Sequence, residues 1–314
     1  MAHMVETMAY AGEVPWHGLG KSVPADLSPA QMLQAAELDW EVVKVPAFIR
    51  TEAGNKGIGR SALVRSSDDR ILDVVTDDWH PVQNAEAFEF FHEYCAAGDM
   101  EMHTAGSLRN GQIVWVLAKV KESFTVFGDD TVESYLLFTN PHRFGQSIDV
   151  RFTPIRVVCN NTLTTSLNMD SERMIKSSHR RAFDVETVKE QLGIATDKLA
   201  KYKEMAEFLG SKRYSDSSLK EYFNRIFPSL GSTKDDEETK MSRTAKIALD
   251  TVETQPGSKF AEGSWWQAFN AVTFLTDHKI GRTADTRLTS AWFGPNRNLK
   301  IKALETAIEY AEAA

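Results

Sequence analysis

The chain has 314 residues, of which 42% are hydrophobic and 25% charged, and this is ordinary globular composition. Its formal net charge of −8 excludes a protein covered in positive charge, but it leaves room for a local basic surface. No apolar run reaches the roughly 20 residues of a membrane helix, and the first residues do not have the pattern of a secretory signal. The two cysteines cannot form a disulfide framework, so we expect a soluble cytoplasmic protein.

The first elements are expected from turn and cap signals. Residues 1–27 have few periodic apolar positions, which predicts an N-terminal arm that docks through Trp16. Ser28 followed by Pro29 and Gln31 is typical of a helix start with a capping box, and this helix should end before Trp40.

The middle of the chain is predicted to be mainly strands. Residues 40–76 contain hairpin-like runs, and a helix follows Asn84 with Phe88, Phe91, His92 and Cys95 on one buried face. Further strands are expected at 100–105, 113–120, 134–139 and 147–159. Their connections are short, so neighbouring strands should pair antiparallel.

The second half is predicted to be helical. Asp184 can cap one long helix, and others should run from Ser218 to Phe227, from Ser264 and from Leu299. The sequence thus predicts an α+β fold, in which a central antiparallel sheet with packed helices precedes a mainly helical C-terminal half. The expected domains are an arm at 1–27, a core at 28–183 and a helical region at 184–314 with a polar linker near 229–240.

Several segments resemble one known family in order along nearly the whole chain. They are Met1-Ala2-His3 and residues 15–20, 79–86, 105–111, 156–163, 263–265, 276–278 and 291–294. Together they resemble the phage/plasmid-like protein family, also called domain of unknown function 932. The family often has a His-Asp-Gly tract where this chain has residues 140–145, beginning Asn140-Pro141-His142. The resemblance implies a setting on mobile bacterial DNA and no particular activity.

A local excess of cations lies between Arg143 and Arg181. Seven basic residues face three acidic ones there, a net charge of +4, so the remainder of the chain carries −12. Some of these cations alternate with Phe144 and Phe152. Single-stranded nucleic acid requires cations for its phosphates and rings or amides for its bases. The predicted phosphate contacts are Arg143, Arg151, Arg156, Lys176, Arg180 and Arg181. Asn160, Asn161 and His142 are expected at sugars or base edges.

The favoured hypothesis is a non-enzymatic single-stranded nucleic-acid-binding protein, with DNA as the expected ligand, that anneals strands and assembles into homo-oligomers, including rings. Certain phage annealing proteins have a similar layout, which is an analogy at the level of fold. The competing interpretation of the same cations is an ordinary sheet whose arginines pair with carboxylates.

Two other functions remain open. One is an enzyme acting on nucleic acid or nucleotides through His142 or Cys159, and the other is a protein-binding module that counters a host defence. No cofactor is expected, because the histidines are scattered and no nucleotide loop or cysteine pair is present.

Overall fold

The structure is a computed structural model that describes residues 5–12, 14, 19–128, 130–156, 161–162, 175–180, 183–184, 187–188, 196–229 and 241–313. The chain divides into two compact units. One unit consists of Met1–Lys121, Tyr135–Phe152 and Ser171–Ile194, and the other of Glu122–Ser134, Thr153–Asp170 and Ala195–Ala314. The expected boundary after residue 183 falls inside the segment Ser171–Ile194 of the first unit, and two inner segments group with the C-terminal helices.

The larger sheet has eight strands in the order β10-β9-β8-β7-β6-β1-β2, with β11 pairing with β9. The strands are β1 (Val5–Ala11), β2 (Lys21–Val23), β6 (Met100–Leu108), β7 (Ile113–Thr125), β8 (Thr131–Pro141), β9 (Ile148–Arg156), β10 (Asn161–Thr162) and β11 (Ile175–Ser177). The predicted turn between β6 and β7 is confirmed, because Arg109, Asn110 and Gly111 all have positive φ and the two strands pair antiparallel.

The N-terminal segment differs from the expected arm. β1 pairs antiparallel with β6 inside the sheet and parallel with β2, so the sheet is mixed. Its Ala9 and Ala11 are buried in the core, where small side chains allow the strands to pack closely. A strand that buries alanine gives a weak apolar period, which is why the pattern indicated an arm. Trp16 lies outside the described residues.

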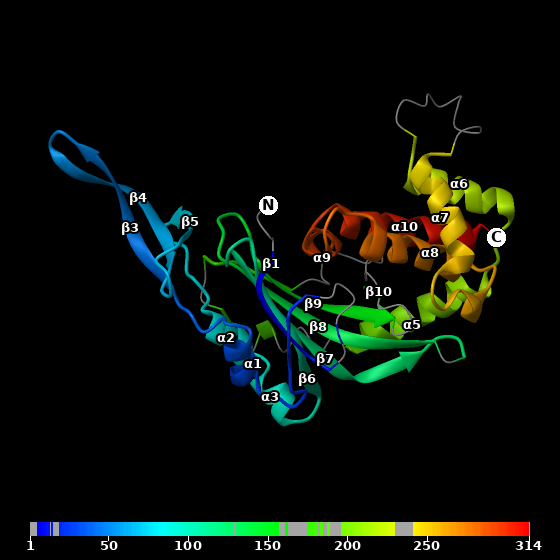
Figure 1. The fold of residues 1–314 in the computed structure, drawn as a ribbon, viewed down its shortest axis with the longest axis horizontal. Coiled ribbons are helices and arrows are strands. Elements are labelled where there is room, and N and C mark those ends of the chain that lie inside the picture. The colour runs from blue at the N-terminus through cyan, green and yellow to red at the C-terminus, as the bar shows by residue number, and fades with distance from the viewer. Residues whose placement is uncertain are drawn as a thin grey trace. The chain divides into compact units, whose positions relative to one another are not determined.

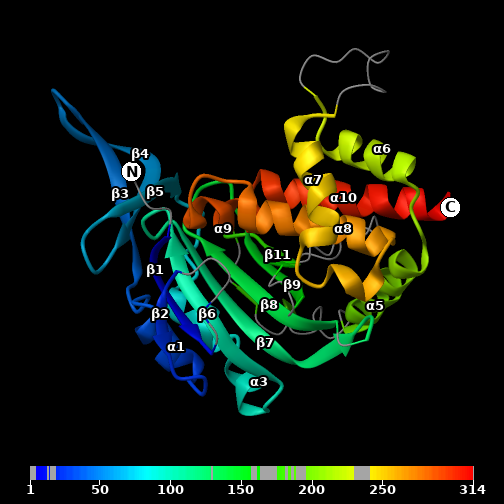
Figure 2. The same ribbon diagram turned by 45° about the vertical axis from the view of Figure 1, so that its right-hand side comes forward.

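A second sheet has the order β3-β4-β5, formed by β3 (Val42–Thr51), β4 (Gly54–Arg65) and β5 (Ile71–Thr76), and both pairings are antiparallel. β5 pairs with β4 only over Arg60–Val64, so the ends of β3 and β4 continue past it as a two-stranded ribbon (Figure 1). We call this ribbon, residues 46–60, the hairpin arm. Its extension beyond β5 is also visible in the turned view (Figure 2).

Three short helices belong to the same unit: α1 (Pro29–Ala35), α2 (Asn84–Glu89) and α3 (His92–Ala96). The capping box predicted at Ser28 is confirmed, with the hydroxyl of Ser28 accepting from the N–H of Gln31. The single helix predicted after Asn84 is divided near Phe90 into α2 and α3. Phe88 and Phe91 are buried as expected, but His92 is exposed, because the break rotates the second helix's faces relative to the first.

The C-terminal unit is mainly helical, as predicted. The helix expected from Asp184 begins among residues that the structure describes only in part, and the helices at 243–254 and 284–293 were not expected from the sequence. Six helices are described in this unit. They are α5 (Thr196–Ser211), α6 (Asp216–Ile226), α7 (Arg243–Thr254), α8 (Trp265–Phe274), α9 (Ala284–Phe293) and α10 (Pro295–Glu312), with a 3-10 turn at Ser258–Ala261 and a π-helical turn, η4, at Leu275–Lys279. Ser264 caps α8 as predicted, and α10 begins at Pro295 rather than at Leu299. The core of this unit packs around Trp265 and Trp266, both buried on α8.

The α+β class predicted from the sequence is confirmed by these two units. Most of the polar linker expected near 229–240 lies outside the described residues. No helix in the described part of the chain combines the length and apolar character needed to cross a membrane.

Candidate functional site

The predicted cations differ in how exposed they are and in whether a carboxylate pairs with them. Arg143 is half-buried in the turn between β8 and β9. Arg151 is also half-buried, and its Nη1 lies 3.3 Å from Asp149 Oδ2, so a carboxylate already neutralises it. Arg180 is 70% exposed and its Nε is 3.8 Å from Asp78 Oδ2. Asp149 and Arg151 are two residues apart in β9 and so lie on one face of the strand, and their pairing fits the competing interpretation in which the sheet arginines pair with carboxylates.

The remaining predicted residues lie outside what the structure describes, in whole or in part. Arg156, Asn161 and Lys176 have backbone positions in β9, β10 and β11, but their side chains are not among those described. Asn160 and Arg181 lie outside the described residues altogether, as does Cys159. Of the six predicted phosphate contacts, the structure therefore describes the side chains of three, Arg143, Arg151 and Arg180.

His142 is fully buried, which is incompatible with the predicted contact to sugars or base edges. Its Nε2 is 3.0 Å from Asn84 Oδ1, and its ring meets Trp40 edge-on with centroids 5.5 Å apart. Asn84 is held in turn, because its amide nitrogen donates to the carbonyls of Leu38 and Trp40. A ligand could reach this imidazole only if the core opened, so we exclude His142 from the interface.

A second buried histidine lies close to the first. His179 stacks on Trp79 with ring centroids 4.0 Å apart, and its Nδ1 is 3.0 Å from the carbonyl oxygen of His80. Burial lowers the pKa of His142 to about 3 and that of His179 to about 4. Both rings are therefore neutral at physiological pH. The segments 79–86 and 140–145, chosen from the sequence, thus converge on one buried structural centre.

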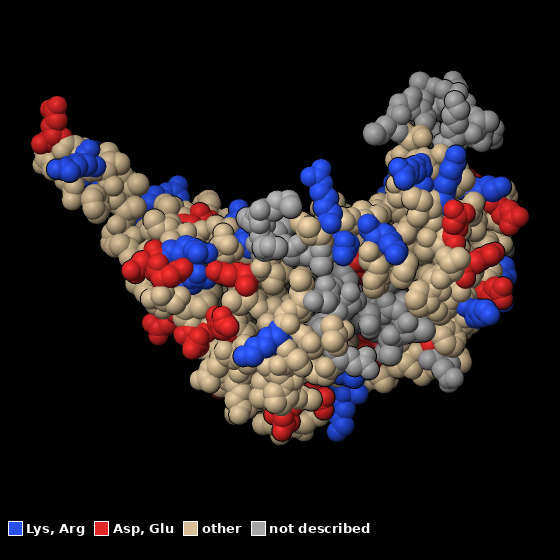
Figure 3. Space-filling view, viewed as in Figure 1, with Lys and Arg blue, Asp and Glu red and all other residues tan. Residues whose placement is uncertain are grey.

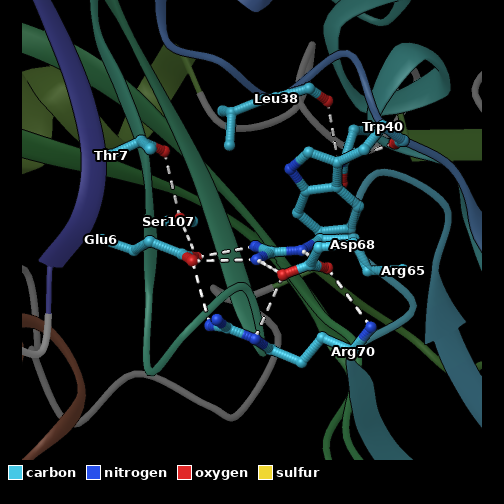
Figure 4. Close-up of polar contacts among 9 residues, drawn as sticks. Glu6, Thr7, Leu38, Trp40, Arg65, Asp68, Arg70 and Ser107 are labelled. Atoms are coloured by element: carbon cyan, nitrogen blue, oxygen red, sulfur yellow. Dashed lines mark hydrogen bonds and ion pairs between the residues drawn. The ribbon is translucent and has the colours of Figure 1, made fainter.

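An ion network joins β1 to the second sheet (Figure 4). The guanidinium of Arg65 donates to both oxygens of Glu6, at 2.8 and 3.0 Å, and to both oxygens of Asp68, at 2.8 and 2.7 Å. It also lies over Trp40, 5.4 Å from the ring centroid. Arg65 lowers the pKa of Asp68 to about 2 through its hydrogen bonds. Because the two carboxylates bind this arginine so fully, it is a structural cation and not a ligand-binding one.

An exposed group of cations and an aromatic ring lies elsewhere on this unit. The guanidinium carbon of Arg60, on β4, is 5.4 Å from the ring centroid of Phe144, and that ring is 47% exposed. The N–H of Phe144 donates to Asp73 Oδ2 at 2.8 Å, which fixes the turn against β5. Arg143 is the adjacent residue on the same turn. We call Arg60, Arg143 and Phe144 the cation–aromatic cluster.

This cluster has cations available for a ligand. Within the described part of the chain, neither Arg60 nor Arg143 forms an ion pair with a carboxylate. Arg143 was predicted as a phosphate contact from the sequence and Phe144 lies beside it, but Arg60 was not predicted. A usable signal existed, because residues 42–65 contain five basic residues and only one acidic residue, Glu52.

The described residues were searched for a metal site and for a reactive thiol. Among them, no group of three or more His, Cys, Asp or Glu side chains could hold a metal ion. Cys95 is half-buried, and burial raises the pKa of its thiol to about 11, so it remains protonated and a poor nucleophile.

Comparison of the chain with models of known protein families gives a match over most of its length. The model of the family described as domain of unknown function 932 matches residues 71–292. The chain belongs to this family. The matched region includes both buried histidines, Arg143, Phe144 and α8, and it begins after the hairpin arm. No curated protein and no solved structure matches the chain.

Proposed function

We propose that this member of the domain of unknown function 932 family binds single-stranded nucleic acid without breaking or forming covalent bonds. The observation that carries the proposal is the cation–aromatic cluster, where an exposed phenyl ring lies under the guanidinium of Arg60 and Arg143 precedes that ring in the same turn. Cations of this kind neutralise phosphates, and an exposed ring can stack on a base, at about 1–3 kcal/mol per base.

The fixed geometry of the turn supports this role. The hydrogen bond from the backbone N–H of Phe144 to Asp73 holds the backbone of this turn in place before any ligand arrives, so binding need not order the loop. Arg180, also exposed, would supply a further phosphate contact from the same unit. DNA as the natural ligand, strand annealing and an origin in phages or plasmids are finer forms of the same proposal.

A salt titration tests the proposal directly. Fluorescence anisotropy of a labelled single-stranded oligonucleotide should give an affinity that falls linearly with the logarithm of salt concentration, with a slope of about −0.7 for each phosphate contact. Duplex of the same sequence should bind more weakly, because its bases cannot stack on Phe144. A flat salt dependence, or no binding at low salt, would contradict the proposal.

The ring itself has a separate test. Phe144→Leu keeps an apolar side chain beneath Arg60 but removes the stacking surface, so single-strand affinity should fall by about 1 kcal/mol or more while the salt slope stays unchanged. Phe48→Leu is the matched control, since Phe48 is another exposed phenylalanine of this unit. Equal losses in the two variants would remove Phe144 from the interface.

A further inference from the structure

The hairpin arm is exposed to solvent on both of its faces. Every residue from 48 to 60 is exposed, and Phe48, Ile49 and Ile58 are exposed by 58%, 50% and 46%. An isolated two-stranded hairpin is only marginally stable in water, so a ribbon with solvent on both faces gains stability when a ligand covers it. A group of exposed apolar side chains on such an element indicates an interaction site.

The charge of the arm favours a polyanion as that ligand. Residues 46–60 contain three cations, Arg50, Lys56 and Arg60, and one carboxylate, Glu52 in the turn at the tip, a net charge of +2. In the described part of the chain, none of these cations forms an ion pair with a carboxylate. The space-filling view shows blue cations along the arm and red atoms at its tip (Figure 3).

The arm is continuous with the cation–aromatic cluster. Arg60 is the last residue of the arm, and it is also the residue whose guanidinium carbon lies 5.4 Å from the ring centroid of Phe144. A nucleic acid that contacts Arg60 at the cluster has therefore reached the base of the arm. The polyanion that the charge of the arm favours is thus a further part of the same ligand.

The other two cations lie on opposite faces of the ribbon. Lys56 pairs with Ile49 and Asn55 pairs with Arg50, and successive pairs of a ladder point to opposite faces. A single strand that runs along one face would reach only one of these cations. The major groove of B-form DNA is bordered by two phosphate backbones and, at about 12 Å wide, admits a two-stranded β-ribbon. Cations on both faces of a ribbon match such a groove.

The backbone of β4 is also accessible in the arm. At Gly57 and Gly59 no atom lies within 4 Å of the position that a Cβ would take. A residue without a side chain allows the backbone and a ligand to approach closely. The walls of a groove can therefore come near the ribbon without a clash.

We propose that the hairpin arm lies in the major groove of duplex DNA, next to the single strand that the cation–aromatic cluster holds. The preferred ligand is then a partly paired DNA, bound where the duplex meets its unpaired strand. Arg50 and Lys56 contact the two backbones of the duplex, and Phe144 stacks on an unpaired base. This inference rests on the proposed function and adds the substrate class to it.

Fluorescence anisotropy with three labelled DNA probes tests this inference: a single strand, a blunt duplex and a duplex with a single-stranded tail. Wild type should bind the tailed duplex more tightly than either other probe. Arg50→Gln combined with Lys56→Gln should make the salt slope on the tailed duplex shallower by about 1.8, because each lost phosphate contact of a duplex removes about 0.9. The affinity of this variant for the single strand should equal that of wild type, because neither cation contacts that strand.

Lys220→Gln combined with Lys246→Gln is the matched control, because it removes the same charge from exposed positions on α6 and α7. A tailed duplex made of RNA should show no gain over single-stranded RNA, because the major groove of an A-form helix is narrow. An equal gain with RNA would overturn the assignment to the major groove.

Two further results would overturn the inference. Equal salt slopes on the tailed duplex for wild type and Arg50→Gln/Lys56→Gln would remove DNA from the arm and favour a protein as its partner. An equal loss of affinity for the single strand and the tailed duplex would show that the single strand itself runs along the arm. Failure of the proposed function is a different result, in which wild type does not bind the single strand at low salt.

Discussion

His142 and His179 show how a residue type with functional promise can be structural. Both rings are buried against tryptophans, and both hydrogen-bond to groups within the unit. From the sequence, His142 was a candidate contact to sugars or base edges and one of the residues through which an enzyme could act. Burial settles the matter here, because a group that no ligand can reach cannot exchange protons with one.

The two histidines make folding stability depend on pH. Their pKa values fall from 6.5 to about 3 and about 4, so between pH 6.5 and 4 the unfolded chain binds protons that the folded chain does not. Stability should therefore be complete above pH 6.5 and decline as pH falls, by up to about 1.4 kcal/mol per pH unit for each histidine. Urea denaturation at a series of pH values measures this decline.

The variant His142→Gln separates this contribution from that of the carboxylates. The glutamine amide can take the place of Nε2 beside Asn84 and cannot be protonated in this range, so the decline below pH 6.5 should be shallower than in wild type. His92→Gln is the control, because His92 is exposed on α3. Parallel curves for His142→Gln and wild type would contradict a neutral buried imidazole.

At the scale of elements, local signals were predictable and long-range ones were not. The Ser28 capping box, the turn at Arg109-Asn110-Gly111 and the start of α8 each depend on a few neighbouring residues, and each is confirmed. The pairing of β1 with β6 joins residues about a hundred positions apart. Nothing in the local pattern of β1 indicates that contact, because its core residues are alanines.

Gly106 shows why β1 can lie beside β6. A Cβ at this position would be 2.3 Å from the Trp115 side chain and 2.4 Å from the carbonyl oxygen of Thr7. Gly106→Ala should therefore destabilise the protein by about 2–3 kcal/mol, because Trp115 or β1 must move. The control is Gly57→Ala in the hairpin arm, where no atom lies within 4 Å of the added methyl group. Chemical denaturation of both variants checks this, and equal stability would contradict the close approach.

The C-terminal unit contains a buried ion pair between η4 and α10. Lys300 Nζ lies 2.9 Å from Asp277 Oδ1, and both side chains are at most 1% exposed. Lys300→Met should cost about 3–5 kcal/mol, because it leaves a buried carboxylate without its cation, and Asp277→Leu added to it should recover most of that loss. Thermal unfolding of the single and double variants measures the difference. A double variant no more stable than Lys300→Met would argue against this pair as the source of the cost.

At the scale of the whole molecule, the fold class was predictable and the interface only in part. An antiparallel hairpin region followed by helical periodicity was sufficient for α+β. The basic segment identified Arg143 and drew attention to Phe144, but Arg60 comes from a strand about eighty residues earlier. Charge counted along one segment cannot find a surface that two distant segments build together, and it cannot tell a free cation from one paired like Arg151.

The measurement that tests the central claim most directly is the salt slope of single-strand binding by Arg60→Ala combined with Arg143→Ala. If these two cations contact phosphates, the double variant should bind more weakly at low salt, with a slope shallower by about 1.4 than wild type. Lys246→Ala combined with Lys220→Ala removes the same charge from exposed positions on α7 and α6 and should keep the wild-type slope. An unchanged slope in Arg60→Ala/Arg143→Ala, or an equal reduction in both double variants, would contradict binding at the cation–aromatic cluster.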